Sequence, residues 1–162
     1  MSSNPIPAWL AEAKKHLGTK EIPGVNHNPL ILSMWKAIKR GGIKTDEVPW
    51  CAAFVGFCLE NVEIVSSRFE SAKSYLDWGR AQTTPCVGSI VVFTRDGGGH
   101  VGFVVGKNAA GALLVLGGNQ GNEVNVRAFP LDRVSGYRWP SAVPEPTEPL
   151  PIGSALATGG EA

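Results

Sequence analysis

The segment from Pro49 to Glu60 is apolar on nearly every side when it is drawn as a helix. Such a helix has no face that suits water, so the rest of the chain must enclose it. The chain has 162 residues, of which 43% are hydrophobic and 18% are charged. This length and composition are typical of one globular domain with one sizeable core.

The hydrophobic period changes along the chain. Residues 7–17 predict an amphipathic helix, and Asn28 followed by Pro29 predicts the cap and first residue of a second helix that runs to about Arg40. Residues 70–79 predict another short helix. Strand patterns follow at 89–94, 100–106, 112–116, 123–129 and 134–139. Helices followed by an antiparallel meander predict an α+β domain.

Residues 1–141 are assigned to this domain. From residue 142 to residue 162 the chain is dominated by Pro, Gly, Ala, Ser and Thr. This composition predicts a disordered tail, because it offers too little apolar surface to offset the entropy of ordering.

The formal net charge is +1, with no basic stripe and no acidic run. This charge pattern gives no case for binding to nucleic acid or to an anionic membrane. No apolar run reaches the roughly 18 residues of a membrane span, and residues 1–7 lack the pattern of a signal peptide. We therefore expect a soluble monomer that is made in the cytoplasm and delivered by other means if its substrate lies outside.

The three cysteines, Cys51, Cys58 and Cys86, are expected to be thiols. Cys51 and Cys58 lie seven positions apart in the predicted helix, which separates them by roughly 10 Å, whereas a disulfide tolerates a Cα separation of only about 7 Å. No Cys-x2–4-Cys pair is present, which argues against a zinc site. Cys58 and Cys86 are expected to be structural.

Cys51 lies in the first turn of the apolar helix, a position that suits a nucleophile. The partial positive charge of a helix N-terminus favours a thiolate, and the N–H groups of the first turn are able to bind an oxyanion. The alternative is a small core cysteine, which is common in apolar helices. Position alone leaves both interpretations open.

A nucleophilic cysteine needs a base, and the candidates are His16, His27 and His100. His16 lies near the end of an exposed helix, and His27 lies in a polar loop. His100 follows three glycines and opens a strand, where a side chain beside a loop is well placed for proton transfer. His100 is therefore the favoured base, and the alternative is a strand-end histidine without a role.

A third group should orient the imidazole. If residues 107–111 form the loop between the two strands that follow the glycines, His100 lies opposite Gly118, within a slip of one or two residues. Asn119 is then a near neighbour, and its amide oxygen is expected to accept the Nδ1 hydrogen. Gln120 is the second candidate, and the alternative for Asn119 is an ordinary turn residue.

Three blocks, Pro49-Trp-Cys-Ala-Ala-Phe-Val, Gly99-His-Val-Gly-Phe and Leu116-Gly-Gly-Asn-Gln, resemble the CHAP and NlpC-type cell-wall peptidases, and most of all a subgroup found in phage genomes. The resemblance covers roughly residues 8–140. It implies a papain-like fold, a peptidoglycan substrate, and Cys51, His100 and Asn119 as catalytic residues. It also implies a substrate groove, which Glu21, Trp50 and Gln120 are expected to line; the alternative for Glu21 is a solvated charge.

This sequence departs from two patterns in that family. Some CHAP enzymes carry a Glu two residues before the Asn, where this chain has Gly117, which leaves the orienting role to Asn119 alone or with Gln120. Some bind calcium through an Asp-rich loop before the Cys, where only Asp46 and Glu47 stand here. These are too few oxygen ligands for a good site, so we expect no required metal and no other cofactor.

These features predict a cysteine amidase or peptidase that hydrolyses an amide bond of bacterial peptidoglycan, with phage lysis as its setting. Three alternatives stay open: a secreted antibacterial effector with an immunity protein, an acyltransferase with the same Cys-His pair, and a non-catalytic wall-binding or virion module. The sequence does not specify which bond is cut.

Overall fold

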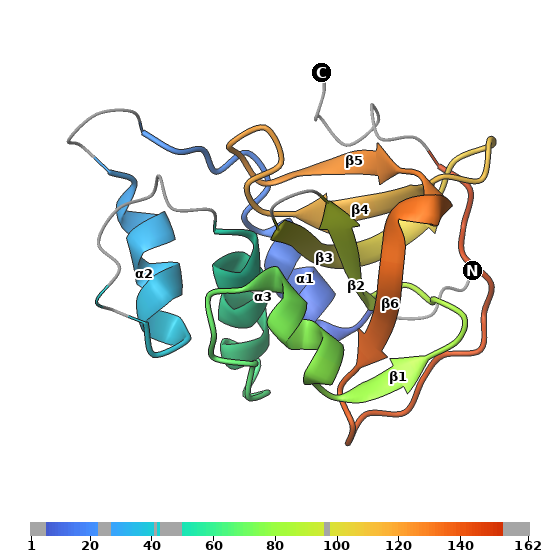
Figure 1. Ribbon diagram of the computed structural model, residues 1–162, viewed down its shortest axis with the longest axis horizontal. Helices are drawn as coiled ribbons and strands as arrows, with labels where there is room; N and C mark the ends of the chain where they lie inside the picture. Colours follow the sequence, from blue (N-terminus) through green and yellow to red (C-terminus); the bar gives the residue numbers. More distant parts are fainter. Residues whose placement is uncertain (1–5, 23–26, 41, 43–49, 96–97, 154–162) are drawn as a thin grey trace.

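A computed structural model describes residues 6–22, 27–40, 42, 50–95 and 98–153. Three α-helices lie on one side of a six-stranded antiparallel sheet (Figure 1). The predicted α+β class is therefore confirmed. None of the helices in the described ranges is both long enough and apolar enough to cross a membrane.

The helices are α1 (Ala8–Lys14), α2 (Pro29–Ala37) and α3 (Cys51–Glu60). The predicted cap of α2 is confirmed, because Oδ1 of Asn28 accepts a hydrogen bond from the N–H of Leu30 at 2.9 Å. Every residue of α3 except Phe57 and Glu60 is buried. The helix lies between α2 and the sheet (Figure 1), as its apolar circumference requires.

The sheet has the strand order β1-β6-β2-β3-β4-β5. The five predicted strands are all present, and the predicted helix at 70–79 is a 3₁₀ helix, η1 (Ala72–Asp77). The three-residue strand β1 was not predicted, because its sequence is short and shows no apolar alternation. The strands are β1 (Arg80–Gln82), β2 (Ile90–Arg95), β3 (Gly98–Lys107), β4 (Leu113–Gly117), β5 (Asn125–Phe129) and β6 (Val134–Trp139).

The sheet is strongly curled. Strands β2 and β5 are separated by two other strands, so in a flat sheet their side chains would be about 14 Å apart. The ring centroids of Phe93 on β2 and Phe129 on β5 nevertheless lie 4.5 Å apart and stack. One face of the sheet packs on the helices, and the other face encloses a second core of Val91, Phe93, Val104, Leu113 and Val115.

The prediction of a disordered tail from residue 142 is wrong for residues 142–153. The carboxylate of Glu145 accepts hydrogen bonds from Arg80 Nε and Gln82 Nε2, each at 2.8 Å. Farther along, the carbonyl of Pro151 accepts a hydrogen bond from the N–H of Lys107 at 2.9 Å. Composition was a poor guide here, because prolines still offer carbonyl acceptors to a sheet edge. Residues 154–162 lie outside the described ranges.

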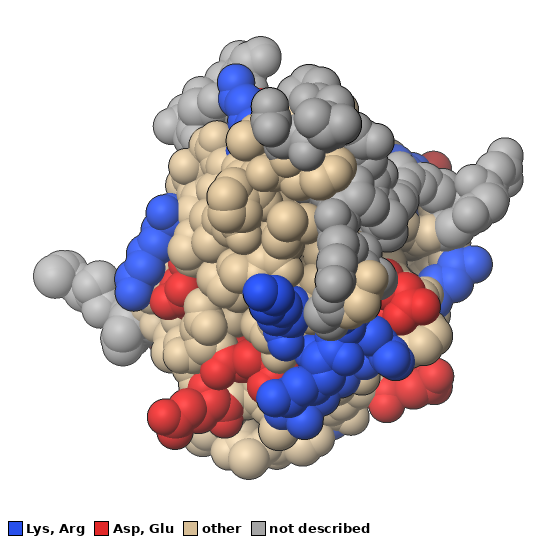
Figure 2. Space-filling view, turned by 90° about the vertical axis from the view of Figure 1, so that its left-hand side faces the viewer, with Lys and Arg blue, Asp and Glu red and all other residues tan. Residues whose placement is uncertain are grey.

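Charge is mixed on the side of the molecule where α2 lies. Figure 2 shows acidic and basic side chains bordering one another there, between areas of uncharged surface. The ion pairs of the described residues include those of Arg68 with Glu60, at 2.9 Å, and of Arg40 with Glu70, at 3.3 Å.

Candidate active site

Cys51 is the first residue of α3, and Trp50 is the cap residue before it. The Cys51 side chain is almost completely buried, with 4% of the residue exposed. The first hydrogen bond across this end of the helix runs from the N–H of Phe54 to the carbonyl of Trp50 at 2.9 Å. The N–H groups of Ala52 and Ala53 therefore precede the first N–H that is hydrogen-bonded within the helix, and they lie at the positive end of the helix dipole.

His100 lies near the start of β3, where it pairs with Phe93 of β2, and it is 4% exposed. Its Nε2 atom lies 2.9 Å from Oε1 of Gln120. The imidazole also lies against a pair of stacked aromatic rings, with its centroid 5.4 Å from that of Phe129 and 6.2 Å from that of Phe93. The base candidate therefore has a fixed ring plane and one fixed hydrogen-bond partner.

The carboxamide of Gln120 has a defined orientation. Its Nε2 donates to the carbonyls of Val115 and Asn125 at 3.2 and 2.9 Å, and it lies 3.0 Å from Oδ1 of Asn125. The amide nitrogen is thus surrounded by acceptors, which leaves the oxygen to face the imidazole. An amide oxygen only accepts, so Nε2 of His100 carries the hydrogen and Nδ1 of the neutral ring carries the lone pair.

The expected orienting residue, Asn119, does not hold this position. It adopts φ = 58° in the turn after β4 and is partly exposed, while its neighbour Gln120 is 4% exposed. The predicted pairing of Gly106 with Ala112 is wrong, because Gly106 pairs with Leu114; beyond a bulge between Val104 and Gly106, Phe103 pairs with Leu116, which is one residue from the predicted register. The hydrogen-bonded ring nitrogen also differs from the prediction, being Nε2 rather than Nδ1.

Two consecutive glycines, Gly117 and Gly118, lie between His100 and the helix that carries Cys51. A Cβ atom on Gly117 would lie 2.5 Å from Oε1 of Gln120 and 3.4 Å from Nε2 of His100. A Cβ atom on Gly118 would lie 2.7 Å from Trp50 Cζ3 and 2.7 Å from the Cβ atom of Phe54. Bare backbone at both positions lets the end of β4 touch the imidazole on one side and the N-terminus of α3 on the other.

The absence of a glutamate at position 117 also has a structural reason. The Gln120 carboxamide already occupies the space that a residue-117 side chain would enter. The hydrogen-bond acceptor of the imidazole is therefore Gln120, in the turn, and not a side chain at position 117, in the strand.

Glu21 is placed beside the nucleophile's helix, as a partner of Trp50. Its Oε2 accepts a hydrogen bond from the indole Nε1 of Trp50 at 2.9 Å, and its N–H donates to the carbonyl of Asn122 at 3.0 Å. The loop after α1 is thereby tied both to the start of α3 and to the turn that carries Gln120. Whether Glu21 also contacts substrate stays a prediction.

Trp50 and Gln120 do not have the exposure expected of groove-lining residues. Trp50 is fully buried, and Gln120 is 4% exposed with both ends of its carboxamide hydrogen-bonded. Their contacts position α3 and His100 rather than present a surface to substrate. Asn125 and Phe129 were not predicted to belong to the site, although the period-2 alternation of residues 123–129 places both on one face of their strand.

The other candidate side chains have structural surroundings. His16 Nε2 lies 3.0 Å from a carboxylate oxygen of Glu12. Burial, with a contribution from the Glu12 charge, raises the pKa of the Cys58 thiol well above its ordinary value, so Cys58 stays protonated. Cys86 is buried beside Ser89. None of the three cysteines is in a disulfide.

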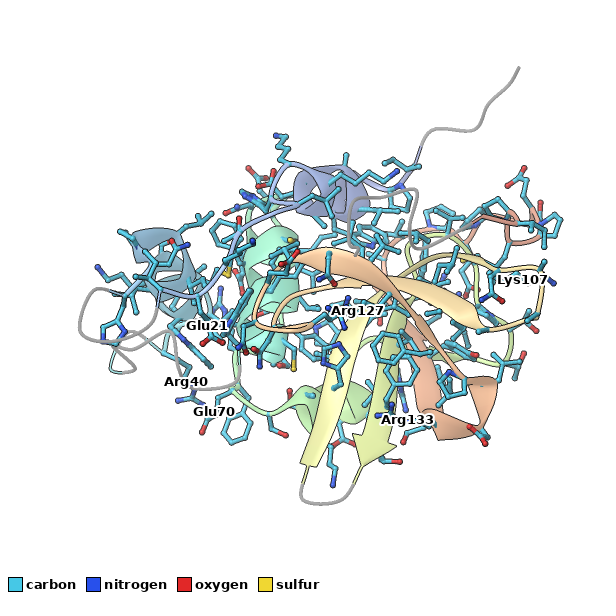
Figure 3. The ribbon with its side chains drawn as sticks, turned by 90° about the horizontal axis from the view of Figure 1, so that it is seen from above. Glu21, Arg40, Glu70, Lys107, Arg127 and Arg133 are labelled. Carbon is cyan, nitrogen blue, oxygen red and sulfur yellow. The ribbon has the colours of Figure 1, made fainter. Side chains whose placement is uncertain are left out.

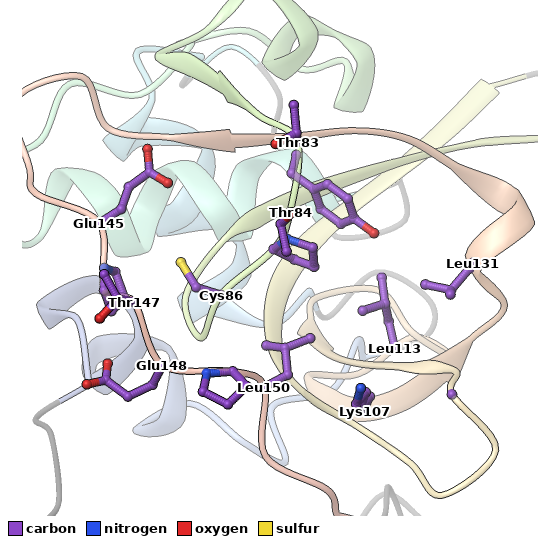
Figure 4. A pocket seen from close by; sticks show the side chains of 15 residues that line it. Thr83, Thr84, Cys86, Lys107, Leu113, Leu131, Glu145, Thr147, Glu148 and Leu150 are labelled. Atoms are coloured by element: carbon purple, nitrogen blue, oxygen red, sulfur yellow. The ribbon is translucent and has the colours of Figure 1, made fainter.

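In the described part of the chain, no three His, Cys, Asp or Glu side chains gather as metal ligands would. The carboxylates considered for calcium, Asp46 and Glu47, lie outside the described residues. A pocket of about 770 Å³ lies away from Cys51 and His100, next to the C-terminal segment, and is lined by residues such as Cys86, Leu131, Glu145 and Leu150 (Figure 4).

A comparison with family models matches residues 43–119 to the CHAP domain. The match begins before α3 and ends at Asn119. It therefore includes Cys51, His100 and the two glycines, Gly117 and Gly118, that contact the surroundings of both. A comparison with curated proteins finds no match. The order of a helix-terminal cysteine and a strand-borne histidine agrees with the match of residues 43–119 to the CHAP domain.

Proposed function

We propose that this chain hydrolyses an amide bond in the peptides of bacterial peptidoglycan, with Cys51 as the nucleophile and His100 as the base. The family supports the reaction class, since CHAP domains are generally cysteine- and histidine-dependent amidases or peptidases. The observation that carries the mechanism is the hydrogen bond from His100 Nε2 to Gln120 Oε1. It leaves the lone pair on Nδ1, which is the state that a general base requires.

In the proposed reaction, His100 Nδ1 takes the thiol proton of Cys51, and Sγ attacks the carbonyl carbon of the amide. The amides of Ala52 and Ala53 are placed to stabilise the oxyanion, because they precede the hydrogen-bond ladder of α3. The C–N bond then breaks, and the imidazolium gives its proton to the leaving amine. Water, deprotonated by His100, finally releases the acyl group from sulfur as a carboxylic acid.

Digestion of purified sacculi in H₂¹⁸O tests this proposal. The account expects soluble fragments with one ¹⁸O in each new carboxyl group and one new amine per cleavage, and mass spectrometry of the fragments identifies the bond. Fragments without ¹⁸O but with an added amine would identify an acyltransferase instead. Intact sacculi would contradict both reactions.

We propose further that the setting is phage or prophage lysis, with the protein made in the cytoplasm and acting on the wall after release. The resemblance of the Cys, His and Asn-Gln blocks to a phage-borne subgroup supports this setting. Expression inside a bacterial host should leave cells intact until the membrane is permeabilised, and should lyse them afterwards. Lysis that needs no permeabilisation, or that a cognate inhibitor gene prevents, would contradict this setting.

A further inference from the structure

Two arginines near His100 have no acidic partner in the described part of the chain. They are Arg127 on β5 and Arg133 at the end of η2 (Leu131–Arg133). Three other arginines are each paired with a glutamate: Arg40 with Glu70, Arg68 with Glu60 and Arg80 with Glu145. Arg127 and Arg133 therefore differ from these three arginines in having no carboxylate partner among the described residues.

Arg133 belongs to the aromatic cluster that holds the imidazole. Its Cζ atom lies 5.9 Å from the ring centroids of both Phe93 and Phe129, and these two rings stack on His100. A guanidinium near aromatic ring faces is attracted to them and keeps all its N–H donors for other partners. Arg133 is only half exposed, so a hydrogen bond to it is less screened than one at a fully exposed site.

Arg127 lies against the turn that carries Gln120. A Cβ atom on Gly121 would lie 2.6 Å from Nη2 of Arg127, so the guanidinium rests on bare backbone one residue after Gln120. Seen from above, Arg127 and Arg133 both lie over the sheet, Glu21 lies on the side of the helices, and Lys107 lies at the far end of the sheet (Figure 3). Both guanidiniums thus border the sheet side of the candidate site.

We infer that Arg127 and Arg133 bind a free carboxylate of the peptide whose amide is cleaved, and so select acidic stem peptides over amidated ones. This inference rests on the proposed function. A guanidinium matches a carboxylate with two parallel N–H donors and matches a carboxamide poorly. In stem peptides the glutamate is linked through its side chain, so its α-carboxylate is a free acid in some walls and an amide in others.

The test measures binding to the Cys51→Ala protein, so that cleavage plays no part. Two synthetic stem peptides are compared by calorimetry, identical except for an α-carboxylate or an α-carboxamide on the glutamate. The acid should bind about 10- to 100-fold more tightly, as expected for charge-assisted hydrogen bonds. In a protein that also carries Arg127→Gln and Arg133→Gln, this preference should disappear while the affinity for the amide changes less than about twofold.

Lys107→Gln is the matched control, because it removes a cation at the far end of β3 and should leave the preference intact. Raising the salt concentration should weaken acid binding and not amide binding. Equal affinity for the two peptides in the Cys51→Ala protein would overturn the inference, as would equal losses for both peptides in the arginine variant. Failure of the wild-type enzyme to cleave either peptide would instead contradict the proposed function, because the binding comparison is made without turnover.

Discussion

Oε1 of Gln120 lies 2.9 Å from Nε2 of His100, while the nitrogen of the same carboxamide is held by Asn125. This arrangement fixes the imidazole tautomer through a neutral acceptor in a turn, three residues beyond the end of β4 at Gly117. The imidazole and its acceptor are both buried, so water does not compete readily for either. The orienting function therefore depends on how the turn after β4 is held.

Gln120→Ala should lower kcat by about 10- to 100-fold, a share of what positioned acid–base catalysis supplies. Removal of the acceptor deletes the hydrogen bond from Nε2 of His100 to Gln120, so the ring loses its preferred tautomer. Asn119→Gly is the control, since it deletes the neighbouring side chain while tolerating φ = 58°. Turnover of sacculi should stay within about threefold of wild type in this control. The reverse ranking of the two variants would restore Asn119 as the orienting residue.

Gly117→Ala should reduce turnover and also lower the melting temperature. The new Cβ would meet the end of the Gln120 side chain, which then has to leave both His100 and the buried carbonyls of Val115 and Asn125. The expected loss in kcat is about tenfold. Gly42→Ala is the control, because no atom of the described residues lies within 4 Å of its Cβ position. Wild-type kinetics for Gly117→Ala would show that the Gln120 contact is dispensable.

Glu21→Ala should impair both folding and turnover. The buried indole N–H of Trp50 loses its acceptor, which costs about 1–3 kcal/mol of unfolding free energy, and the start of α3 loses its tie to the loop after α1. Glu21→Gln keeps an oxygen acceptor and should stay near wild type. Urea unfolding and kcat should be measured together. Unchanged stability and unchanged kcat in Glu21→Ala would show that Glu21 is only a solvated charge.

Truncation after residue 141 should destabilise the domain by about 2–4 kcal/mol, given about 0.5–1.5 kcal/mol for each hydrogen bond lost. The segment removed contributes acceptors to Arg80, Gln82, Lys107 and Trp139. Truncation after Gly153 keeps all of these contacts and serves as the control. Identical urea midpoints for the two truncated proteins would show that residues 142–153 add nothing to stability.

The features that the sequence predicted well are those fixed by strong local patterns. The apolar circumference of residues 51–60 required a buried helix, and Cys51 followed as its first residue. The strands were found from alternation, although the exact pairing of β3 with β4 was not. The bulge that shifts this pairing depends on tertiary packing, and no periodicity in residues 104–106 reveals it.

The acceptor of His100 was missed for a related reason. Alternation assigns faces only while a strand continues, and β4 ends at Gly117. Beyond that point, positive φ values at Asn119 and Gly121 turn the chain, so that Gln120 rather than Asn119 reaches the imidazole. The burial of Trp50 likewise depends on an acceptor, Glu21, that lies 29 residues away in sequence.

The central claim is that the Cys51 thiolate cleaves an amide of the bacterial wall, and one comparison tests it most directly. Purified sacculi are incubated with wild-type protein, with Cys51→Ala and with Cys58→Ala, and new amine termini are counted by mass spectrometry. Cys58 is the matched control, because it lies in the same buried helix and its thiol pKa is raised by burial. The account predicts release by wild type and Cys58→Ala and none above background by a folded Cys51→Ala. Wild-type release by Cys51→Ala would contradict it.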